Sequence, residues 1–221
     1  MNKKALTLIE LIFSITILSI VIIGSLRFIS ASYGAYNGAK SNIIVELELK
    51  SSLKLISKKL SHSSDLVVYN DILEWNEIDY RGFRAKQYSG YSDLNISNNK
   101  VLISPNSDFS KSKNIKNSML KMGDKTYQIK DSKNDKIYFK DTSNKTITQT
   151  YLLISAHYTI RLDNGSLKLY KNDFNSMNMS KGYLILKDVS KFKISKNGNI
   201  LDIKICINED KICSSKAIII D

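Results

Sequence analysis

The feature that most constrains this chain is an apolar run close to its N-terminus, from Leu6 to Leu26. The run holds 21 residues and a single charged side chain, that of Glu10. At about 1.5 Å per residue, a helix of this length reaches roughly 31 Å, which is close to the hydrocarbon thickness of a bilayer. The run therefore predicts a helix that crosses a membrane.

The flanking charges set the orientation of this helix. Lys3 and Lys4 precede the run with no acid beside them. Because positive residues stay on the cytoplasmic side, the N-terminus is expected in the cytoplasm and everything after about Arg27 outside it. We therefore expect a single-pass protein of the inner (cytoplasmic) membrane with a periplasmic or extracellular head.

Glu10 is the residue that a simple membrane anchor does not explain. An ionised carboxylate at the centre of a membrane helix costs about 2.5 to 3.5 kcal/mol on insertion scales, and less near the interface, so it persists mainly where it finds a partner. An uncleaved signal anchor accounts for the run, as does a secretory signal peptide cut near Ser30 and Ser32. Both leave Glu10 without a role.

The residues around Glu10 resemble a known signal. Residues 3–10, KKALTLIE, followed directly by the apolar run, resemble the class III signal of type IV pilins and type II secretion pseudopilins. In that family a prepilin peptidase removes a short basic leader ahead of the run, which here places the cut between Ala5 and Leu6. The usual residues at these positions are Gly and Phe, so both depart from the family pattern.

The resemblance implies a role for the new N-terminus and for Glu10. In the family the new α-amine, here that of Leu6, is N-methylated and stays cationic. In a filament of staggered helices, the Glu10 carboxylate of one subunit can pair with the Leu6 ammonium of its neighbour, which lowers the burial penalty of both charges on assembly. Pairing within one subunit is the alternative.

The resemblance and the sequence pattern together divide the N-terminal part into a cleaved leader, 1–5, a transmembrane helix, 6–28, and an amphipathic continuation of that helix, 29–62. Gly34 and Gly38 each weaken a helix by about 1 kcal/mol relative to Ala, so we expect a bend or local melting there. Two helices joined by a Gly-containing linker are the alternative. The continuation carries apolar residues at steps of three or four, namely Val45, Leu49, Leu53, Ile56 and Leu60.

Residues 63–221 have the texture of a β-rich globular head. Short runs rich in Ile, Val, Tyr and Thr alternate apolar and polar side chains and predict an antiparallel sheet. Turn signals at Asp163-Asn164-Gly165 and at Asn197-Gly198 each separate two such runs and predict hairpins. A region near 91–125 is dense in Ser, Asn and Lys and is expected to form long surface loops. The fold class is α+β, a long helix packed on an antiparallel sheet, as in pilins.

Cys206 and Cys213 flank the sequence INEDKI. If Asn208 to Lys211 turn the chain, the two cysteines face each other across a hairpin, where β-carbons approach closely enough for a bridge. An exterior compartment permits oxidation, so we expect a disulfide, with two buried thiols as the alternative. The spacing does not suit a tetrahedral metal site.

The sequence shows no pattern that supports catalysis, such as a phosphate-binding glycine loop, a nucleophile elbow or a zinc-protease helix. We therefore expect no enzymatic activity, no catalytic residue, no cofactor and no bound metal. His157 is expected to be an ordinary sheet residue. The stretch DSKNDK, 131–136, lacks the glycine and distal glutamate of a calcium loop, so a solvated turn is expected.

The net charge of +12 comes mostly from lysines spread along the whole chain, and arginine is scarce. Dispersed lysines are typical of solvated surfaces, and phosphate recognition favours arginine, so nucleic-acid binding is possible but not favoured. The stretch from Tyr69 to Tyr91 interleaves aromatic residues with Arg81, Arg84 and Lys86. Such a mixture suits a nucleic-acid or protein contact, and sheet packing explains it equally well.

Taken together, these features predict a minor pilin or pseudopilin, a structural component of a type II secretion pseudopilus or a type IV pilus, in protein secretion, adhesion and motility, or DNA uptake. The large β-rich head resembles J-type pseudopilins, and Glu10 argues against the tip-most subunit, which lacks this acid. Expected partners are other pilin or pseudopilin subunits, prepilin peptidase, the inner-membrane assembly platform, and membrane lipid before assembly. The alternative is a bitopic, signal-anchored protein with a periplasmic binding domain.

Overall fold

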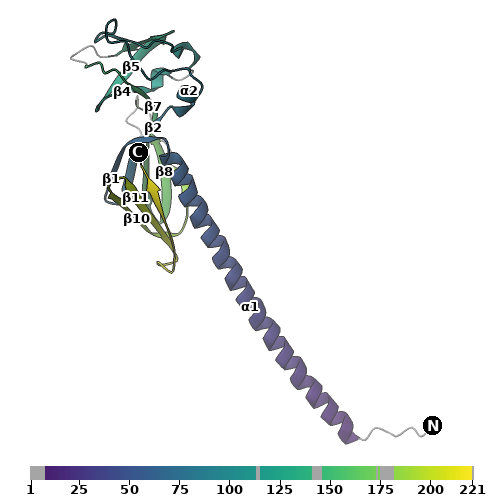
Figure 1. The fold of residues 1–221 in the computed structure, drawn as a ribbon. Coiled ribbons are helices and arrows are strands. Elements are labelled where there is room, and N and C mark those ends of the chain that lie inside the picture. Colours follow the sequence, from purple (N-terminus) through teal and green to yellow (C-terminus); the bar gives the residue numbers. More distant parts are fainter. Residues whose placement is uncertain (1–7, 113–114, 141–145, 173, 175–181, 221) are drawn as a thin grey trace. The chain divides into compact units, whose positions relative to one another are not determined.

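The computed structural model describes residues 8–112, 115–140, 146–172, 174 and 182–220 (Figure 1). The chain divides into two compact units, Met1–Leu47 and Glu48–Asp221. The predicted α+β class is confirmed, because a long N-terminal helix is followed by antiparallel strands.

The long helix, α1, runs from Leu8 to Leu60. Every residue between these ends is helical, including Gly34 and Gly38, so the expected local melting and the two-helix alternative are both wrong, while a bend at these glycines stays a prediction. A cost of about 1 kcal/mol per glycine is small beside the cooperative hydrogen bonding of the flanking turns. Propensity alone overestimated the effect of the two glycines.

The part of α1 that belongs to the second unit buries one face. Leu49, Leu53, Ile56 and Leu60 are all at most 3% exposed, whereas Lys54 and Lys58 between them are exposed. These four residues are the predicted apolar stripe, and Val45 at its start belongs to the first unit. The spacing of three and four therefore identified the face of the helix that packs in the head.

The larger sheet has nine strands within the described residues, and every pairing in it is antiparallel. Its strand order is β1-β2-β7-β4-β5-β6-β3, while β8 pairs with β7 and β9. The central strand β7 therefore pairs with β2 along one edge and with β4 and β8 along the other. The strands are β1 (Ser63–Tyr69), β2 (Ile72–Ile78), β3 (Val101–Ile103), β4 (Met119–Met122), β5 (Lys125–Lys133), β6 (Lys136–Phe139), β7 (Leu152–Asp163), β8 (Ser166–Asn172) and β9 (Tyr183–Leu186).

A second, three-stranded sheet in the described part of the chain consists of β10 (Val189–Asn197), β11 (Ile200–Ile207) and β12 (Ile212–Ile219), with β11 in the middle. Both predicted hairpins are present, since β7 turns into β8 and β10 turns into β11 through two-residue loops. In the first loop Asn164 and Gly165 have φ of 47° and 71°. These are the left-handed angles that tight hairpins need and that the Asn-Gly signal supplies.

In the described part of the head, three short helical elements lie among the strands: α2 (Tyr80–Arg84), η1 (Phe109–Lys111) and η2 (Ile115–Asn117). The region near 91–125 is rich in loops, as expected, but its expected surface location is wrong for its apolar residues. Leu102, Phe109, Ile115, Leu120 and Met122 are all buried in one hydrophobic cluster, together with residues of β5, β6 and β7. Leu102 belongs to the short apolar run Val101–Ile103, and Leu120 and Met122 alternate along β4, so these residues carry a brief strand signal. The surrounding Ser, Asn and Lys residues outweigh it in the composition of the region.

A network of buried hydroxyl groups stabilises the same region where regular hydrogen bonding stops. Ser104 is fully buried, and its hydroxyl lies 2.8 Å from the Tyr151 hydroxyl and 2.7 Å from that of Ser107. It also donates to the carbonyl of Tyr91 at 2.7 Å. Satisfied polar groups of this kind let a polar sequence form part of an interior.

Candidate functional site

The first unit presents an apolar helix surface. Apolar side chains from Leu8 to Leu26 are exposed, and α1 contains a stretch long and apolar enough to cross a membrane. The hydroxyls of Ser14, Thr16, Ser19 and Ser25 each donate to the carbonyl four residues earlier, at 2.7 to 2.8 Å. Because hydrocarbon offers no hydrogen-bond partner, this internal bonding suits a helix surrounded by lipid or by other apolar helices.

Glu10 lies in the first described turn of α1 with its side chain exposed, and its backbone carbonyl accepts the Ser14 hydroxyl at 2.8 Å. An acid in this position complements the partial positive charge of the helix N-terminus. Ala5 and Leu6 lie outside the described residues. The pairing of Glu10 with the Leu6 amine, the cut before Leu6 and its N-methylation therefore stay predictions.

The two cysteines lie opposite each other in the β11–β12 hairpin. Cys206 pairs in register with Cys213, their Cα atoms are 4.1 Å apart, and their sulfur atoms are at disulfide-bonding distance. The chain turns at Asn208 to Lys211, as predicted, with left-handed backbone at three successive residues. Cys206 is buried and Cys213 is exposed, so the bridge ties the outer edge strand β12 to the middle strand of the small sheet.

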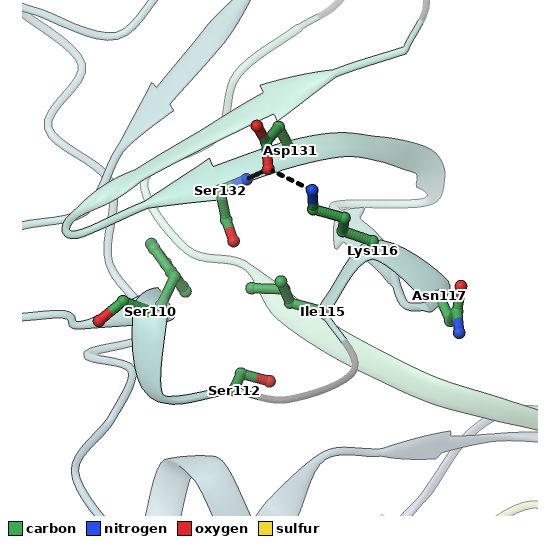
Figure 2. A pocket seen from close by; sticks show the side chains of 8 residues that line it. Ser110, Ser112, Ile115, Lys116, Asn117, Asp131 and Ser132 are labelled. Atoms are coloured by element: carbon green, nitrogen blue, oxygen red, sulfur yellow. Dashed lines mark hydrogen bonds and ion pairs between the residues drawn. The ribbon is translucent and has the colours of Figure 1, made fainter.

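The stretch DSKNDK forms the tight β5–β6 hairpin, in which Lys133 faces Lys136 and Asn134 has a φ of 52°. A pocket of about 540 Å³ lies beside it. There the Asp131 carboxylate accepts hydrogen bonds from Lys116 and from the backbone N–H of Ser132 (Figure 2). The hydrogen bond from Lys116 lowers the pKa of Asp131.

Among the described residues no group of three or more His, Cys, Asp or Glu side chains is arranged to hold a metal ion.

His157 lies on β7, as expected for a sheet residue. Its Nδ1 is 3.0 Å from Oδ1 of Asn76 on β2, and its Nε2 is 3.9 Å from a carboxylate oxygen of Glu74. Both contacts tie the imidazole to the neighbouring strand β2.

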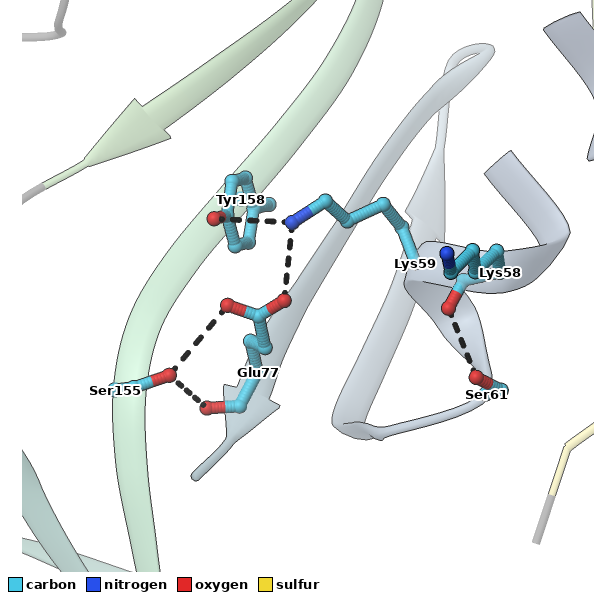
Figure 3. Close-up of polar contacts among 6 residues, drawn as sticks. All are labelled: Lys58, Lys59, Ser61, Glu77, Ser155 and Tyr158. Atoms are coloured by element: carbon cyan, nitrogen blue, oxygen red, sulfur yellow. Dashed lines mark hydrogen bonds and ion pairs between the residues drawn. The ribbon is translucent and has the colours of Figure 1, made fainter. Parts of the chain in front are cut away.

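A polar cluster that the sequence did not reveal joins the end of α1 to the large sheet. Lys59 Nζ lies 3.1 Å from the Glu77 carboxylate and 3.4 Å from the Tyr158 hydroxyl, and it stands 4.7 Å above the Tyr158 ring (Figure 3). Partial burial alone would lower the pKa of Lys59, but its hydrogen bond and charge interaction with Glu77 outweigh this and raise it. Lys59 therefore stays protonated and bridges β2 and β7. Partners 18 and 99 residues away leave no local signal in a sequence.

The aromatic stretch from Tyr69 to Tyr91 is divided between core and surface. Trp75 is fully buried and stacks on Tyr158 with ring centroids 5.4 Å apart, and Tyr88 is 4% exposed. The side chains of Tyr69, Tyr80 and Tyr91 are exposed. Sheet packing thus explains part of the pattern, and the exposed aromatic residues remain available for contacts.

The match to a known family lies in the first unit. Residues 1–26 match the family model described as the prokaryotic N-terminal methylation motif. The chain carries a type IV pilin-like prepilin signal. No match is found among curated proteins or solved structures. The motif and the apolar helix together fit a membrane-anchored, pilin-like protein that prepilin peptidase processes, that assembles with other pilin subunits and whose role is structural.

Proposed function

We propose that this chain is a minor pilin or pseudopilin that is cut between Ala5 and Leu6, N-methylated at Leu6 and assembled into a filament through α1. The observation that carries the proposal is the methylation-motif match over residues 1–26, coinciding with a helix that is apolar from Leu8 to Leu26 except for one acid and a few small polar residues. An ordinary signal anchor, which is not a prepilin signal, has no need of an acid within its apolar run.

The exposed surface of the first unit supports assembly through the helix. Its apolar side chains point outward around the helix and need a cover, which is lipid before assembly and the helices of neighbouring subunits afterwards. Glu10 then determines the register. Its carboxylate pairs with the Leu6 ammonium of the next subunit, so that the two buried charges compensate each other only in the correct stagger.

The disulfide supports a location of the head outside the cytoplasm. Bridges such as Cys206–Cys213 persist in oxidising compartments and are rare in the reducing cytoplasm. Together with Lys3 and Lys4 ahead of the helix, this favours an inner-membrane protein with a cytoplasmic N-terminus and a periplasmic or extracellular head.

In this proposal the chain serves a type II secretion pseudopilus or a type IV pilus as a minor subunit, as J-type pseudopilins do. The assembly platform in the inner membrane would extract it from lipid into the filament. Its large head, with two sheets beyond the helix, would present loops to neighbouring subunits or to cargo.

The test is fractionation of cells that produce an epitope-tagged chain together with a filament assembly machinery. We expect the chain in filaments sheared from the cells when prepilin peptidase is active, and in the membrane alone when the peptidase active site is mutated. A chain that stays in the membrane fraction in both strains would instead be a permanently anchored protein, which contradicts the proposal.

A further inference from the structure

The second unit contains a cationic groove of about 1100 Å³, lined by residues from the end of α1, β2, α2, η1, η2, β7 and β8. Its lining includes six basic side chains and two acidic ones. The basic ones are Lys58, Lys59, Arg81, Arg84, Lys111 and Lys171, and the acidic ones are Glu77 and Asp79. We name this surface the cationic groove.

Both acids of the cationic groove are bonded to donors of the protein itself. Glu77 accepts from Lys59, as described above. Asp79 caps α2, since one carboxylate oxygen accepts the N–H of Gly82 at 3.2 Å and the other accepts the hydroxyl of Tyr88 at 3.0 Å. Burial raises the pKa of Tyr88 to about 12, so this hydroxyl keeps its proton. Lys59 thus offsets the charge of Glu77, while Asp79 keeps its negative charge, and the basic side chains of the lining still outnumber the acidic ones.

The arginines are gathered where the rest of the chain uses lysine. The sequence contains four arginines against 29 lysines, and two of the four, Arg81 and Arg84, lie in the cationic groove. Three residues apart on α2, they share one face of the helix, and both are exposed. The planar guanidinium fork binds phosphate in a bidentate manner, which the ammonium of lysine cannot do.

Close packing and capping by neighbouring residues hold the short helix α2 in place. Gly82 is buried against the Tyr88 ring, and a Cβ at this position would lie 1.9 Å from the ring. Together with the Asp79 cap, this close packing fixes the short helix that carries both arginines.

An aromatic platform stands in the same groove. The rings of His62 and Tyr80 stack with centroids 4.2 Å apart and planes 7° from parallel, and both residues are exposed. Tyr80 is 47% exposed. An exposed ring beside cations is the combination with which proteins hold an unpaired base and its phosphates.

We propose that the cationic groove binds single-stranded nucleic acid, with Arg81, Arg84 and Lys58 on the phosphates and one base stacked on the platform of Tyr80 and His62. A single strand is favoured over a duplex because stacking on Tyr80 requires a free base face. Charge spread along the sequence did not favour such binding; the fold does, by bringing these residues together. The proposal concerns the head alone and does not depend on cleavage or assembly of the chain.

The first test measures binding of a fluorescently labelled oligothymidine to the full-length chain in detergent micelles, by fluorescence anisotropy at several salt concentrations. The double variant Arg81→Gln, Arg84→Gln is expected to bind roughly tenfold more weakly. Its slope of log affinity against log salt should be shallower by about 1.4, or about 0.7 for each lost phosphate contact.

The matched control is Lys193→Gln, Lys204→Gln. These exposed lysines face each other on β10 and β11, do not line the cationic groove, and carry the same total charge as the two arginines. The control should bind within about twofold of the parent. Equal weakening of both double variants would show binding by net charge and overturn the proposal. If the arginine variant fails to fold, Lys58→Gln on α1 takes its place.

The second test separates stacking from charge. Tyr80→Ala should weaken oligothymidine binding roughly fivefold or more, because stacking on an aromatic ring contributes about 1 to 3 kcal/mol per base. It should leave binding of heparin, which has no bases, unchanged, and Tyr69→Ala on β1 should change neither. Absence of oligothymidine binding, equally tight binding of a duplex or of polyglutamate, or no effect of Tyr80→Ala would each overturn the proposal.

Discussion

Two stretches of the same helix behave differently, residues 8–47 in the first unit and residues 48–60 in the second. The first is apolar on every side near its start, and its apolar side chains are exposed. The second has one apolar stripe, and that stripe is buried. The difference teaches that periodic apolar residues identify a partner within the same chain, whereas an apolar surface all round identifies lipid or other subunits as the surroundings.

The largest effect is expected from Glu10→Gln, which tests what surrounds the first stretch. Loss of the carboxylate leaves the ammonium of the neighbouring subunit buried without its partner, so incorporation into filaments should fall roughly tenfold or more. The measurement is the amount of chain in sheared filaments relative to the membrane fraction.

The control for Glu10→Gln is Glu48→Gln, which removes the same charge from an exposed position on the same helix. It should leave incorporation unchanged. Equal incorporation of Glu10→Gln and the parent would contradict the register role of Glu10, while thermal unfolding of the head should be the same in all three proteins.

The second-largest effect is expected on the stability of the head, when one apolar residue of each stretch is replaced by alanine. Ile56→Ala empties a fully buried position and should lower the free energy of unfolding of the head by about 2 to 5 kcal/mol. Ile17→Ala, at a position that is 60% exposed, should not change it. Urea unfolding followed by Trp75 fluorescence provides the measurement, and similar losses in both variants would remove the distinction between the stretches.

Replacing a glycine by alanine should have a smaller effect on stability, and the sign of that effect should differ between the two units. Gly82→Ala forces a methyl group against the Tyr88 ring and should destabilise the head by about 1 to 3 kcal/mol. Gly38→Ala meets no atom within 4 Å and should strengthen the helix by about 1 kcal/mol. Circular dichroism during thermal unfolding distinguishes them, and a stable Gly82→Ala head would show that Tyr88 can move aside.

The smallest effect is a pH dependence confined to the head. Burial alone would raise the pKa of Asp65, but hydrogen bonds from Lys121 and Asn76 outweigh it and lower the pKa. A lowered pKa in the folded state stabilises the head above the unfolded value of about 3.9, and this contribution disappears as the pH falls through the folded value. Asp65→Asn should therefore flatten the loss of stability below about pH 4.

The same variant suits the backbone, because Asp65 has a φ of 54° and Asn tolerates that conformation. Lys121→Gln removes the partner instead of the acid and should flatten the pH profile of unfolding in the same way. An unchanged profile in both variants would show that this ion pair contributes nothing to acid stability.

Local signals were sufficient for much of the fold. Alternation and Asn-Gly turns predicted the strands of the C-terminal third and their hairpins, and the cysteine spacing predicted the opposed pair Cys206 and Cys213, because each depends on residues close in sequence. The buried cluster around Phe109 and the Lys59–Glu77–Tyr158 contacts were not predictable in this way, because they join residues that are far apart in the chain. The cationic groove was predictable in part. The sequence marks Arg81 and Arg84 among aromatic residues, but it does not show that Lys58 and Lys111 line the same groove.

The central claim, that this chain is a processed pilin-like subunit, is tested most directly by the intact mass and N-terminal sequence of the membrane-purified protein. With active prepilin peptidase we predict a chain that starts at Leu6 and carries one methyl group on its amine. With a catalytically inactive peptidase, the chain should keep residues 1–5. A chain that retains Met1 in the presence of active peptidase would contradict the account.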